Sequence, residues 1–386
     1  MLEYYNKYGI IPVDQSVVTE NYNLFKMRRV YLYSNLGIPL SLVTEKSVIE
    51  FGPGTGDNAS VISFFKPSKL DLVDGNIASI NRLNTRFGTE LGKNIINIYN
   101  CDAKSFTPNM SPQTTGGGGY DLVVCEGMIN GNENPGQLLK HVASFVKPGG
   151  LLVITTVSAF GVLDQGLRRI YMPAISTKFN KWEDQVTCAS NIFRNSLQNL
   201  PTTKPIEHWV QDAILHPLKK NYIFSTSDAI NYLTDFKPIG SSPRFYNDYR
   251  WFKSLKHNLK NEQERFLSQY KLIEPILLDS NLEPPQLLKF LSKETDFEAW
   301  GEIVGDIWDL SCEIYESKSY EKILLLQSKL SNFINLTNGL SLTVTKGLEE
   351  FIEELPRIAD GNLENGMPNF EKWWGRGLTY LALVRE

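Results

Sequence analysis

The feature that most constrains this chain is the stretch EFGPGTG, Glu50 to Gly56, in which glycine occupies every second position. It follows the short apolar segment KSVIEF and precedes DNASVISFF, which has the pattern of a helix with Asp57 or Asn58 as its N-terminal cap. Glycine lets bare backbone approach a ligand, and a helix behind the turn presents unpaired N–H groups. The pattern therefore predicts a strand, a ligand-binding turn and a helix in direct succession.

The spacing of the glycines argues against a nicotinamide dinucleotide. Such a site requires GxGxxG, whereas here Gly52, Gly54 and Gly56 alternate and position 57 is aspartate. The third glycine of that motif is missing, so we expect no NAD binding.

An acidic residue followed by alternating glycines at the end of a first strand resembles motif I of the class I S-adenosylmethionine-dependent methyltransferases. Four further stretches follow in the order typical of that family: KLDLVDGN, NIINIYNCDAKSF, YDLVVCEGMI and FVKPGGLLVITTV. The resemblance covers about 110 residues and implies an α/β fold, in which a seven-stranded, mostly parallel, doubly wound sheet carries large helical insertions that form a cap. It also implies S-adenosylmethionine as the cofactor.

The resemblance assigns roles to residues at three strand ends. Glu50 supplies charge for the α-ammonium group of the cofactor, and the glycine turn wraps its methionine part. Asp74 accepts the two ribose hydroxyls, and Asp102 meets the adenine amino group. The residues assigned to the cofactor in this way are Glu50, Gly52, Gly54, Gly56, Asp74, Gly75, Asn76, Asp102 and Ala103.

The rest of the chain divides around this core. We expect a helical preface (1–45), the cofactor-binding core (46–157), a helical insertion (158–225), a core helix with strand six (226–245), a helical cap insertion (246–376) and a final core strand (377–386). The last segment, GRGLTYLALVRE, alternates as an antiparallel seventh strand would. The alternative places strand seven at YRWFKSL and leaves the C-terminal helices as an appendage.

Within the preface, Arg28, Arg29 and Tyr33 have two interpretations. They form a solvated basic face, or they contact the methionine carboxylate or the substrate. The residues alone leave both open.

Methyl transfer to a hydroxyl needs a base, and two places offer one. His208, Asp212 and His216 fall at i, i+4 and i+8 of an expected helix, and this insertion begins after strand five, on the catalytic side. A pair of Asp212 and His216 is one hypothesis for the base, and a polar helix face without chemistry is the alternative. For Glu126, at the end of strand four, the resemblance implies a position that faces the transferring methyl group, and the alternative is a carboxylate that caps backbone.

Candidate residues for the acceptor follow strand six. Arg244 and Tyr246 offer bidentate contacts and stacking to an anionic or sugar-like acceptor, or they pack the two insertions together. The chain lacks the Asn/Asp-Pro-Pro-aromatic motif typical of many methylases of nucleic-acid bases and of glutamine.

The composition of the chain limits the classes of partner that we expect it to bind. The 39 basic and 43 acidic residues give a net charge of −4, which offers no general attraction to nucleic acid or to an acidic membrane. Four cysteines without CxxC spacing predict neither a zinc site nor disulfides, and with no leader or membrane-spanning pattern we expect a cytoplasmic protein. No metal is expected.

The whole pattern resembles bacterial class I methyltransferases of the small-molecule or surface-sugar type, and this resemblance implies an O-methyltransferase of a sugar or another small hydroxylated metabolite. One alternative is an N-methyltransferase of an amine or a protein side chain. Another is an inactive cofactor-binding subunit that holds a protein partner. The helical insertions also offer surfaces for a homo-oligomer.

Overall fold

A computed structural model describes residues 2–10, 22–88, 95–110, 119–198, 200, 205–217, 220–251, 253, 262–290, 296–364 and 366–386. Residues 11–21 of the predicted preface therefore lie outside the described residues. The chain forms two compact units. Unit 1 comprises 1–156, 223–270 and 378–386, and unit 2 comprises 157–222 and 271–377. Each is described by itself.

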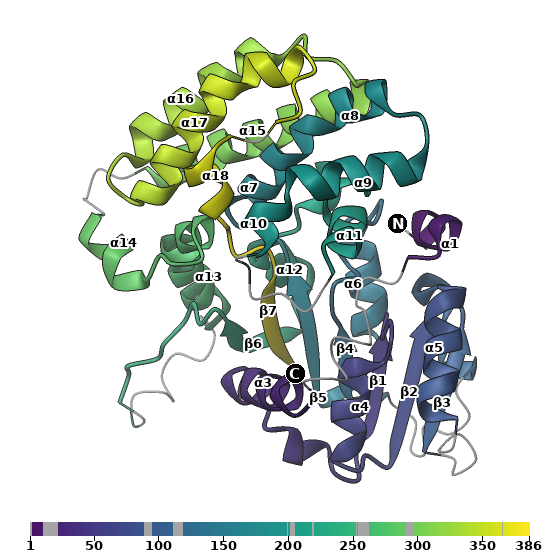
Figure 1. Cartoon of the computed structure of the whole chain (residues 1–386). Coiled ribbons are helices and arrows are strands. Elements are labelled where there is room, and N and C mark those ends of the chain that lie inside the picture. Colours follow the sequence, from purple (N-terminus) through teal and green to yellow (C-terminus); the bar gives the residue numbers. More distant parts are fainter. Residues whose placement is uncertain are drawn as a thin grey trace. The chain divides into compact units, whose positions relative to one another are not determined.

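Unit 1 is built on a seven-stranded sheet with the strand order β3-β2-β1-β4-β5-β7-β6 (Figure 1). Strands β1 to β5 pair in parallel, and β7 is antiparallel to both of its neighbours. This confirms the predicted α/β class and its mostly parallel sheet. The strands are β1 (Ser47–Phe51), β2 (Lys69–Asp74), β3 (Ile96–Asn100), β4 (Tyr120–Cys125), β5 (Val146–Thr156), β6 (Phe236–Ser242) and β7 (Thr379–Arg385).

The end of the chain supplies the seventh strand, as the alternation in GRGLTYLALVRE predicts. Thr379 lies opposite Thr156 of β5, and Arg385 lies opposite Phe236 of β6. Because β7 fills the position between β5 and β6, the alternative seventh strand at YRWFKSL is wrong.

Helices cover both faces of this sheet. Side chains of α3, η1, α4 and α5 pack with β-strand residues in one apolar cluster, and α6 and α12 pack against each other on the opposite face (Figure 1). The helices of unit 1 are α1 (Leu2–Tyr8), α3 (Tyr22–Asn35), η1 (Leu40–Val43), α4 (Asp57–Phe64), α5 (Ile77–Phe87), η3 (Ala103–Ser105), η4 (Pro108–Met110), α6 (Pro135–Ala143), α12 (Thr226–Tyr232) and the start of α13 (Glu262–Ile273).

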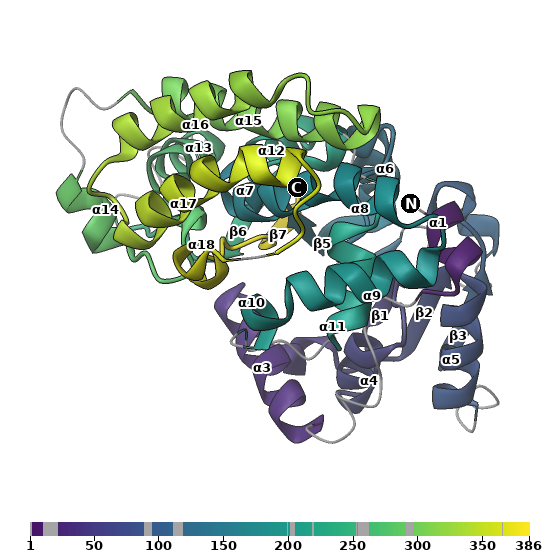
Figure 2. The same ribbon diagram turned by 45° about the horizontal axis from the view of Figure 1, so that its top comes forward.

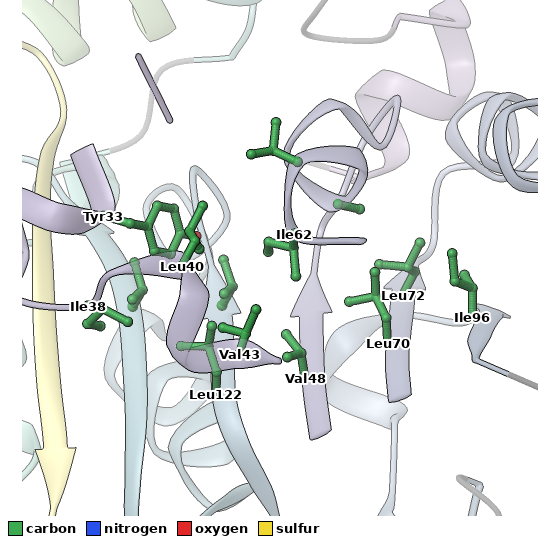
Figure 3. Close-up of a cluster of buried hydrophobic side chains, with 14 of the residues drawn as sticks. Tyr33, Ile38, Leu40, Val43, Val48, Ile62, Leu70, Leu72, Ile96 and Leu122 are labelled. Carbon is green, nitrogen blue, oxygen red and sulfur yellow. The ribbon is translucent and has the colours of Figure 1, made fainter. Parts of the chain in front are cut away.

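The apolar cluster beneath α3 and α4 fixes which side chains of β1 face these helices. Figure 3 shows Val48 of β1 in this cluster, with the ring of Tyr33 beside Leu40. Successive side chains of a strand point to opposite faces, so Glu50 lies on the same face as Val48. The ring of Phe51 packs instead against Phe106 and Phe145. The alternation therefore turns Glu50 toward α3 and α4.

Unit 2 is helical. Its helices are α7 (Ala159–Arg168), η5 (Arg169–Tyr171), α8 (Met172–Lys178), α9 (Trp182–Ile192), α10 (Arg194–Gln198), α11 (Ile206–Trp209), η6 (Val210–Ile214), η7 (Lys220–Tyr222), η10 (Glu274–Leu278), α14 (Pro284–Phe290), α15 (Phe297–Ser317), α16 (Ile323–Thr337), α17 (Leu342–Ala359) and α18 (Pro368–Lys372). α16 packs against both α15 and α17 (Figure 2). Across the described part of the chain, no helix combines the length and apolar character needed to span a bilayer.

A buried arginine ties the two chain segments of unit 2 together. Arg168 pairs with Asp164 at 2.8 Å and donates to the carbonyl oxygens of Phe370 and Trp373. Its guanidinium lies 4.0 Å from the ring centroid of Trp374. A charge that is both paired and hydrogen-bonded can be buried at tolerable cost, so this cluster joins α7 to the segment around α18.

Candidate functional site

The glycine turn between β1 and α4 has the backbone that its sequence requires. Gly52, Gly54 and Gly56 have φ values of +71°, +57° and +78°, a region that other residues enter at a cost. The amide of Gly52 donates to the carbonyl oxygen of Val73 at 2.9 Å, which ties the turn to β2. The three alternating glycines therefore build one left-handed turn at the carboxyl end of β1.

The helix begins one residue earlier than predicted. Gly56 occupies the N-cap position, and Asp57 is already the first helical residue, so the expected cap at Asp57 or Asn58 is wrong. Asp57 instead forms a 2.5 Å ion pair with Arg86.

The three glycines differ in what surrounds them. A Cβ atom at Gly52 would lie 2.5 Å from the sulfur of Met128, and one at Gly56 would lie 2.7 Å from Leu83. A Cβ atom at Gly54 would meet nothing within 4 Å. The open side of the turn is therefore at Gly54, and this is where a ligand can approach the backbone.

Asp74 lies beside this open side. Its carboxylate accepts hydrogen bonds from the amides of Gly54, at 3.1 Å, and Asn76, at 2.8 Å. Burial raises the pKa of Asp74, and these two bonds oppose the rise. Since a carboxylate has about four acceptor sites, Asp74 can hold the turn and still accept ligand hydroxyls.

The ends of β2 and β3 converge on the same region. A Cβ atom at Gly75 would lie 3.4 Å from the amide nitrogen of Asp102, so there is little room there for a side chain. Asn76 caps α5, and Asp102 caps η3, where Ala103 is buried. The cofactor residues predicted on β1, β2 and β3 are thus all at the carboxyl edge of the sheet.

Glu50 is almost completely buried, with 3% of its surface exposed. Its Oε1 accepts a 2.9 Å hydrogen bond from the Asn58 side chain, while its Oε2 is buried and has no partner among the described residues. Burial, followed by repulsion from Glu126, raises the pKa of Glu50 to about 7, although Asn58 and Arg29 oppose the rise. A buried acceptor without a partner is costly, and it marks a position where a ligand cation would be stabilised.

Helix α3 closes this side of the site with an ion pair. Arg29 lies 2.5 Å from Oε1 of Glu126, and the hydroxyl of Tyr33 donates to the same oxygen at 3.0 Å. The side-chain amide of Asn58 approaches the Tyr33 oxygen at 3.4 Å. Burial favours neutral Arg29, but Glu126, Tyr33 and Tyr380 together outweigh it, and the pKa of Arg29 rises well above its ordinary value.

The solvated-face interpretation of α3 is therefore wrong for Arg29 and Tyr33, which are buried, and correct for exposed Arg28. Asn58, which was predicted only as a helix cap, contacts both Glu50 and Tyr33. The available signal was the i, i+4 spacing of Arg29 and Tyr33, which puts both side chains on one face of α3.

Asp212 and His216 lie in unit 2, in a segment that departs from the predicted helix. Helix α11 ends at Trp209, a π-helical turn runs from Val210 to Ile214, and His216 lies beyond it. The predicted single stripe through His208, Asp212 and His216 is therefore wrong, because a π-turn changes the angular spacing of side chains. Their role as a catalytic base stays a prediction.

The surroundings of His216 weaken it as a proton acceptor. Burial and the guanidinium of Arg169 lower the pKa of His216 to about 4, and Asp212 offsets this only in part. At neutral pH the imidazole is uncharged, yet general-base catalysis is most effective when the pKa lies near the working pH.

Arg244 and Tyr246 follow β6 and have partners within unit 1. Arg244 donates to the carbonyl oxygen of Asn35 at 3.3 Å, and the Tyr246 hydroxyl donates to Glu262 at 3.3 Å. Their role in acceptor binding stays a prediction.

The chemistry of the site fits S-adenosylmethionine. Glu50 and Asp74 place two carboxylates beside an open glycine turn, where a ligand with an ammonium group and ribose hydroxyls finds matching acceptors. Within the described ranges, no group of three or more metal-ligating side chains is arranged to hold an ion.

Comparison with known proteins agrees with this chemistry. A family model described as a methyltransferase domain matches residues 27–200. Malonyl-[acyl-carrier protein] O-methyltransferase 2 of Ilyobacter polytropus is 24% identical over 153 residues, which are 37% of this chain and 55% of that protein. A hybrid PKS-NRPS synthetase of Fusarium sp. (strain FN080326) is 42% identical over 53 residues, which are 13% of this chain and 1% of the synthetase. The chain thus spans about half of the first relative and a small fraction of the second.

Solved structures give weaker matches. The plantazolicin methyltransferase BpumL in complex with SAH is similar over 69% of this chain and 82% of its own, at 14% identity and a TM-score of 0.34. The N-methyltransferase NodS from Bradyrhizobium japonicum WM9 is similar over 34% of this chain and 61% of its own, at 18% identity and a TM-score of 0.28. Because these TM-scores are low, the fold assignment rests on the strand order itself.

The family model over residues 27–200 and the order of the strands show a methyltransferase domain with the class I fold in this part of the chain, and S-adenosylmethionine is the cofactor that its acidic strand ends and glycine turn fit.

Proposed function

We propose that the chain transfers a methyl group from S-adenosylmethionine to a hydroxyl oxygen of a small acceptor, such as a sugar or another hydroxylated metabolite. The observation that carries this proposal is the position of Glu126. It follows β4 directly, lies in the same buried cluster as Glu50, and is a carboxylate at the edge of the glycine turn. The relative from Ilyobacter polytropus, whose name describes an O-methyltransferase, supports oxygen as the accepting atom.

When bound, S-adenosylmethionine supplies a methyl group on a positively charged sulfur. The chain contributes mainly binding and orientation, since an in-line displacement depends on alignment. Glu50 attracts the ammonium group, Asp74 and the Gly54 turn position the ribose and methionine parts, and Asp102 is proposed to meet the adenine amino group. These residues all belong to unit 1.

Glu126 is the base in this proposal. Arg29 and Tyr33 both contact its Oε1, which leaves Oε2 as the oxygen that can accept the proton of an acceptor hydroxyl. Asp212 and His216 remain the second candidate, and the low pKa of His216 makes this pair the weaker one. Arg244 and Tyr246 are proposed to contact the acceptor in exchange for their present partners.

One observation favours a second candidate function, methylation of an amine or a protein side chain. Arg29 and Tyr33 both contact Oε1 of Glu126, so this carboxylate has only one oxygen left to receive a proton from an acceptor. An amine that is already unprotonated needs less help from a base than a hydroxyl does. Matched hydroxyl and amino acceptors separate the two functions.

The test is turnover of S-adenosylmethionine by the purified full-length chain, measured as S-adenosylhomocysteine formed. The acceptors are matched sets: a sugar or hydroxylated metabolite, the same compound with its hydroxyls methylated, and its amino analogue, with an acyl group on a carrier protein as a further arm. Turnover with the hydroxyl compound alone supports the proposal. Turnover with the amine alone supports the second candidate. Binding of cofactor without turnover on any acceptor favours an inactive subunit.

A further inference from the structure

The cluster around Glu50 has one carboxyl group more than it has cations. The charged and titratable groups that face Glu50 are Arg29 and Tyr33 of α3, Asp57 of α4, Cys125 of β4 and Glu126 after β4. Arg29 neutralises Glu126, and Arg86 neutralises Asp57. Among the residues that the structure describes, no cation contacts Glu50. Among the described residues, Glu50 is therefore the carboxyl group of this cluster that has no ion-pair partner, and Arg29 offsets its charge only in part.

A hydrogen-bonded chain fixes the position of this carboxyl. Asn58 donates to Oε1 of Glu50 at 2.9 Å and approaches the Tyr33 oxygen at 3.4 Å, and Tyr33 donates to Glu126 at 3.0 Å. The chain thus links the acidic residue of β1 to the one after β4. Because Oε1 is engaged, Oε2 is the atom that is left to carry a proton or to face a ligand cation.

We propose that the ammonium group of S-adenosylmethionine displaces a proton from Glu50 when it binds, and that Asn58 and Tyr33 are positioning residues for this exchange. The proton passes to solvent, and the carboxylate and the ammonium group form an ion pair, for which Glu50 has no partner among the described residues of the free protein. This inference rests on the cofactor half of the proposed function and is independent of the acceptor.

The exchange makes cofactor affinity depend on pH in a defined direction. Burial raises the pKa of Glu50 to about 7, so below neutrality the binding-competent, charged form becomes the minor one. Apparent affinity is reduced by the fraction of competent protein, which falls tenfold for each pH unit below the pKa. Between pH 7 and pH 5 we expect the affinity to fall on the order of 50-fold.

The experiment is calorimetric titration of the full chain with S-adenosylhomocysteine at pH 7 and pH 6, in buffers that differ in ionisation enthalpy. The buffer dependence of the heat measures the protons released. We expect about half a proton at pH 7 and nearly one at pH 6. The matched control ligand is 5′-methylthioadenosine, which keeps the adenosine and lacks the amino acid part. Its binding should release no protons.

Two variants complete the test. Glu50→Gln should still bind S-adenosylhomocysteine, more weakly and without proton release. Asn58→Ala removes a hydrogen bond to the charged carboxylate, so the pH midpoint of binding should move upward, and Asn58→Ser, which can still donate, should restore it in part. A purely structural role of Asn58 would lower affinity equally at every pH and would overturn its assignment as a positioning residue.

The outcomes separate this inference from the function itself. Tight binding of S-adenosylhomocysteine with no proton release at pH 6 would overturn the inference and leave the cofactor assignment intact. Equal release with 5′-methylthioadenosine would also overturn it, because the ammonium group would not be the cause. If neither ligand binds, both the inference and the proposed function fail.

Discussion

At the scale of single residues, Glu50 combines a structural cost with a binding role. A carboxylate that is buried at 3% exposure and has no ion-pair partner among the described residues destabilises the free protein whenever it is charged. When a ligand with a cationic group binds, that cation stabilises the buried carboxylate, so the ligand removes a cost that is present in the free protein. A residue of this kind should lower the stability of the free protein and raise its affinity for the ligand.

The first prediction concerns Glu50→Gln. The pKa of Glu50 rises from 4.5 to about 7 on folding, so the folded state holds more protons than the unfolded state in this range, and stability falls as pH increases through it. The glutamine variant escapes this loss. We expect it to gain up to about 3 kcal/mol of unfolding free energy over the wild type at pH 8, and little at pH 4. Urea unfolding of the variant and the wild type, without cofactor and at both pH values, measures this gain. An equal difference in unfolding free energy at pH 4 and pH 8 would contradict the prediction.

The second prediction concerns His216, where the sign is opposite. Its pKa falls from 6.5 to about 4 on folding, so the unfolded state takes up a proton first, and stability is lost as pH falls from 6.5 toward 4. At pH 5 this loss is about 2 kcal/mol, and His216→Asn should not show it. Comparing urea unfolding at pH 7.5 and pH 5 isolates the effect, with His208→Asn of helix α11 as control. A wild-type-like pH dependence in His216→Asn would show that the buried imidazole does not titrate as stated.

At the scale of elements, different glycines of the turn contribute to folding and to ligand binding. Gly52 and Gly56 are confined by Met128 and Leu83, whereas Gly54 has open space beside it. Gly52 and Gly56 are therefore needed for the packing of the turn, whereas Gly54 leaves space for the ligand.

The third prediction follows from this contrast. Gly54→Ala should cost only the strain of a positive φ, about 1–2 kcal/mol of stability, but should reduce affinity for S-adenosylhomocysteine because its Cβ enters the ligand side. Gly52→Ala meets a sulfur at 2.5 Å and should lose more stability. Thermal unfolding and calorimetry on both variants test this, and it is wrong if Gly54→Ala binds as the wild type does.

The elements that could be predicted are those whose signal is local. Alternation in the last residues indicated β7, and acidic residues after apolar runs indicated the ends of β1, β2 and β3. Burial of Arg29 and Tyr33 could not be predicted in the same way, because it depends on β4 placing Glu126 opposite α3. The π-turn after Trp209 also has no marker in the local sequence, so the predicted stripe through His216 failed.

At the scale of the whole molecule, the two units have different tasks in this account. Every residue assigned to the cofactor lies in unit 1, and unit 2 is held together by contacts between two distant chain segments. Stability of unit 2 and cofactor affinity should therefore respond to different substitutions.

The fourth prediction concerns Arg168→Ala. Removing one partner of a buried, hydrogen-bonded ion pair should cost about 3–5 kcal/mol of unfolding free energy. The matched control is Arg357→Ala, which breaks an exposed pair with Glu354 and should cost less than about 1 kcal/mol. Denaturant unfolding compares the two, and similar small losses would remove Arg168 from its structural role. Under conditions where it remains folded, Arg168→Ala should bind S-adenosylhomocysteine with normal affinity.

The central claim is that S-adenosylmethionine binds at the carboxyl edge of the sheet with Asp74 on its ribose. Its most direct test is calorimetric titration of wild type, Asp74→Asn and Asp74→Ala with S-adenosylhomocysteine, with NAD as the negative control. We predict binding to the wild type, no binding of NAD, and a loss of about 1–3 kcal/mol in Asp74→Ala, as expected for hydrogen bonds to a charged group. Unchanged affinity in folded Asp74→Ala, or binding of NAD in place of S-adenosylhomocysteine, would contradict the account.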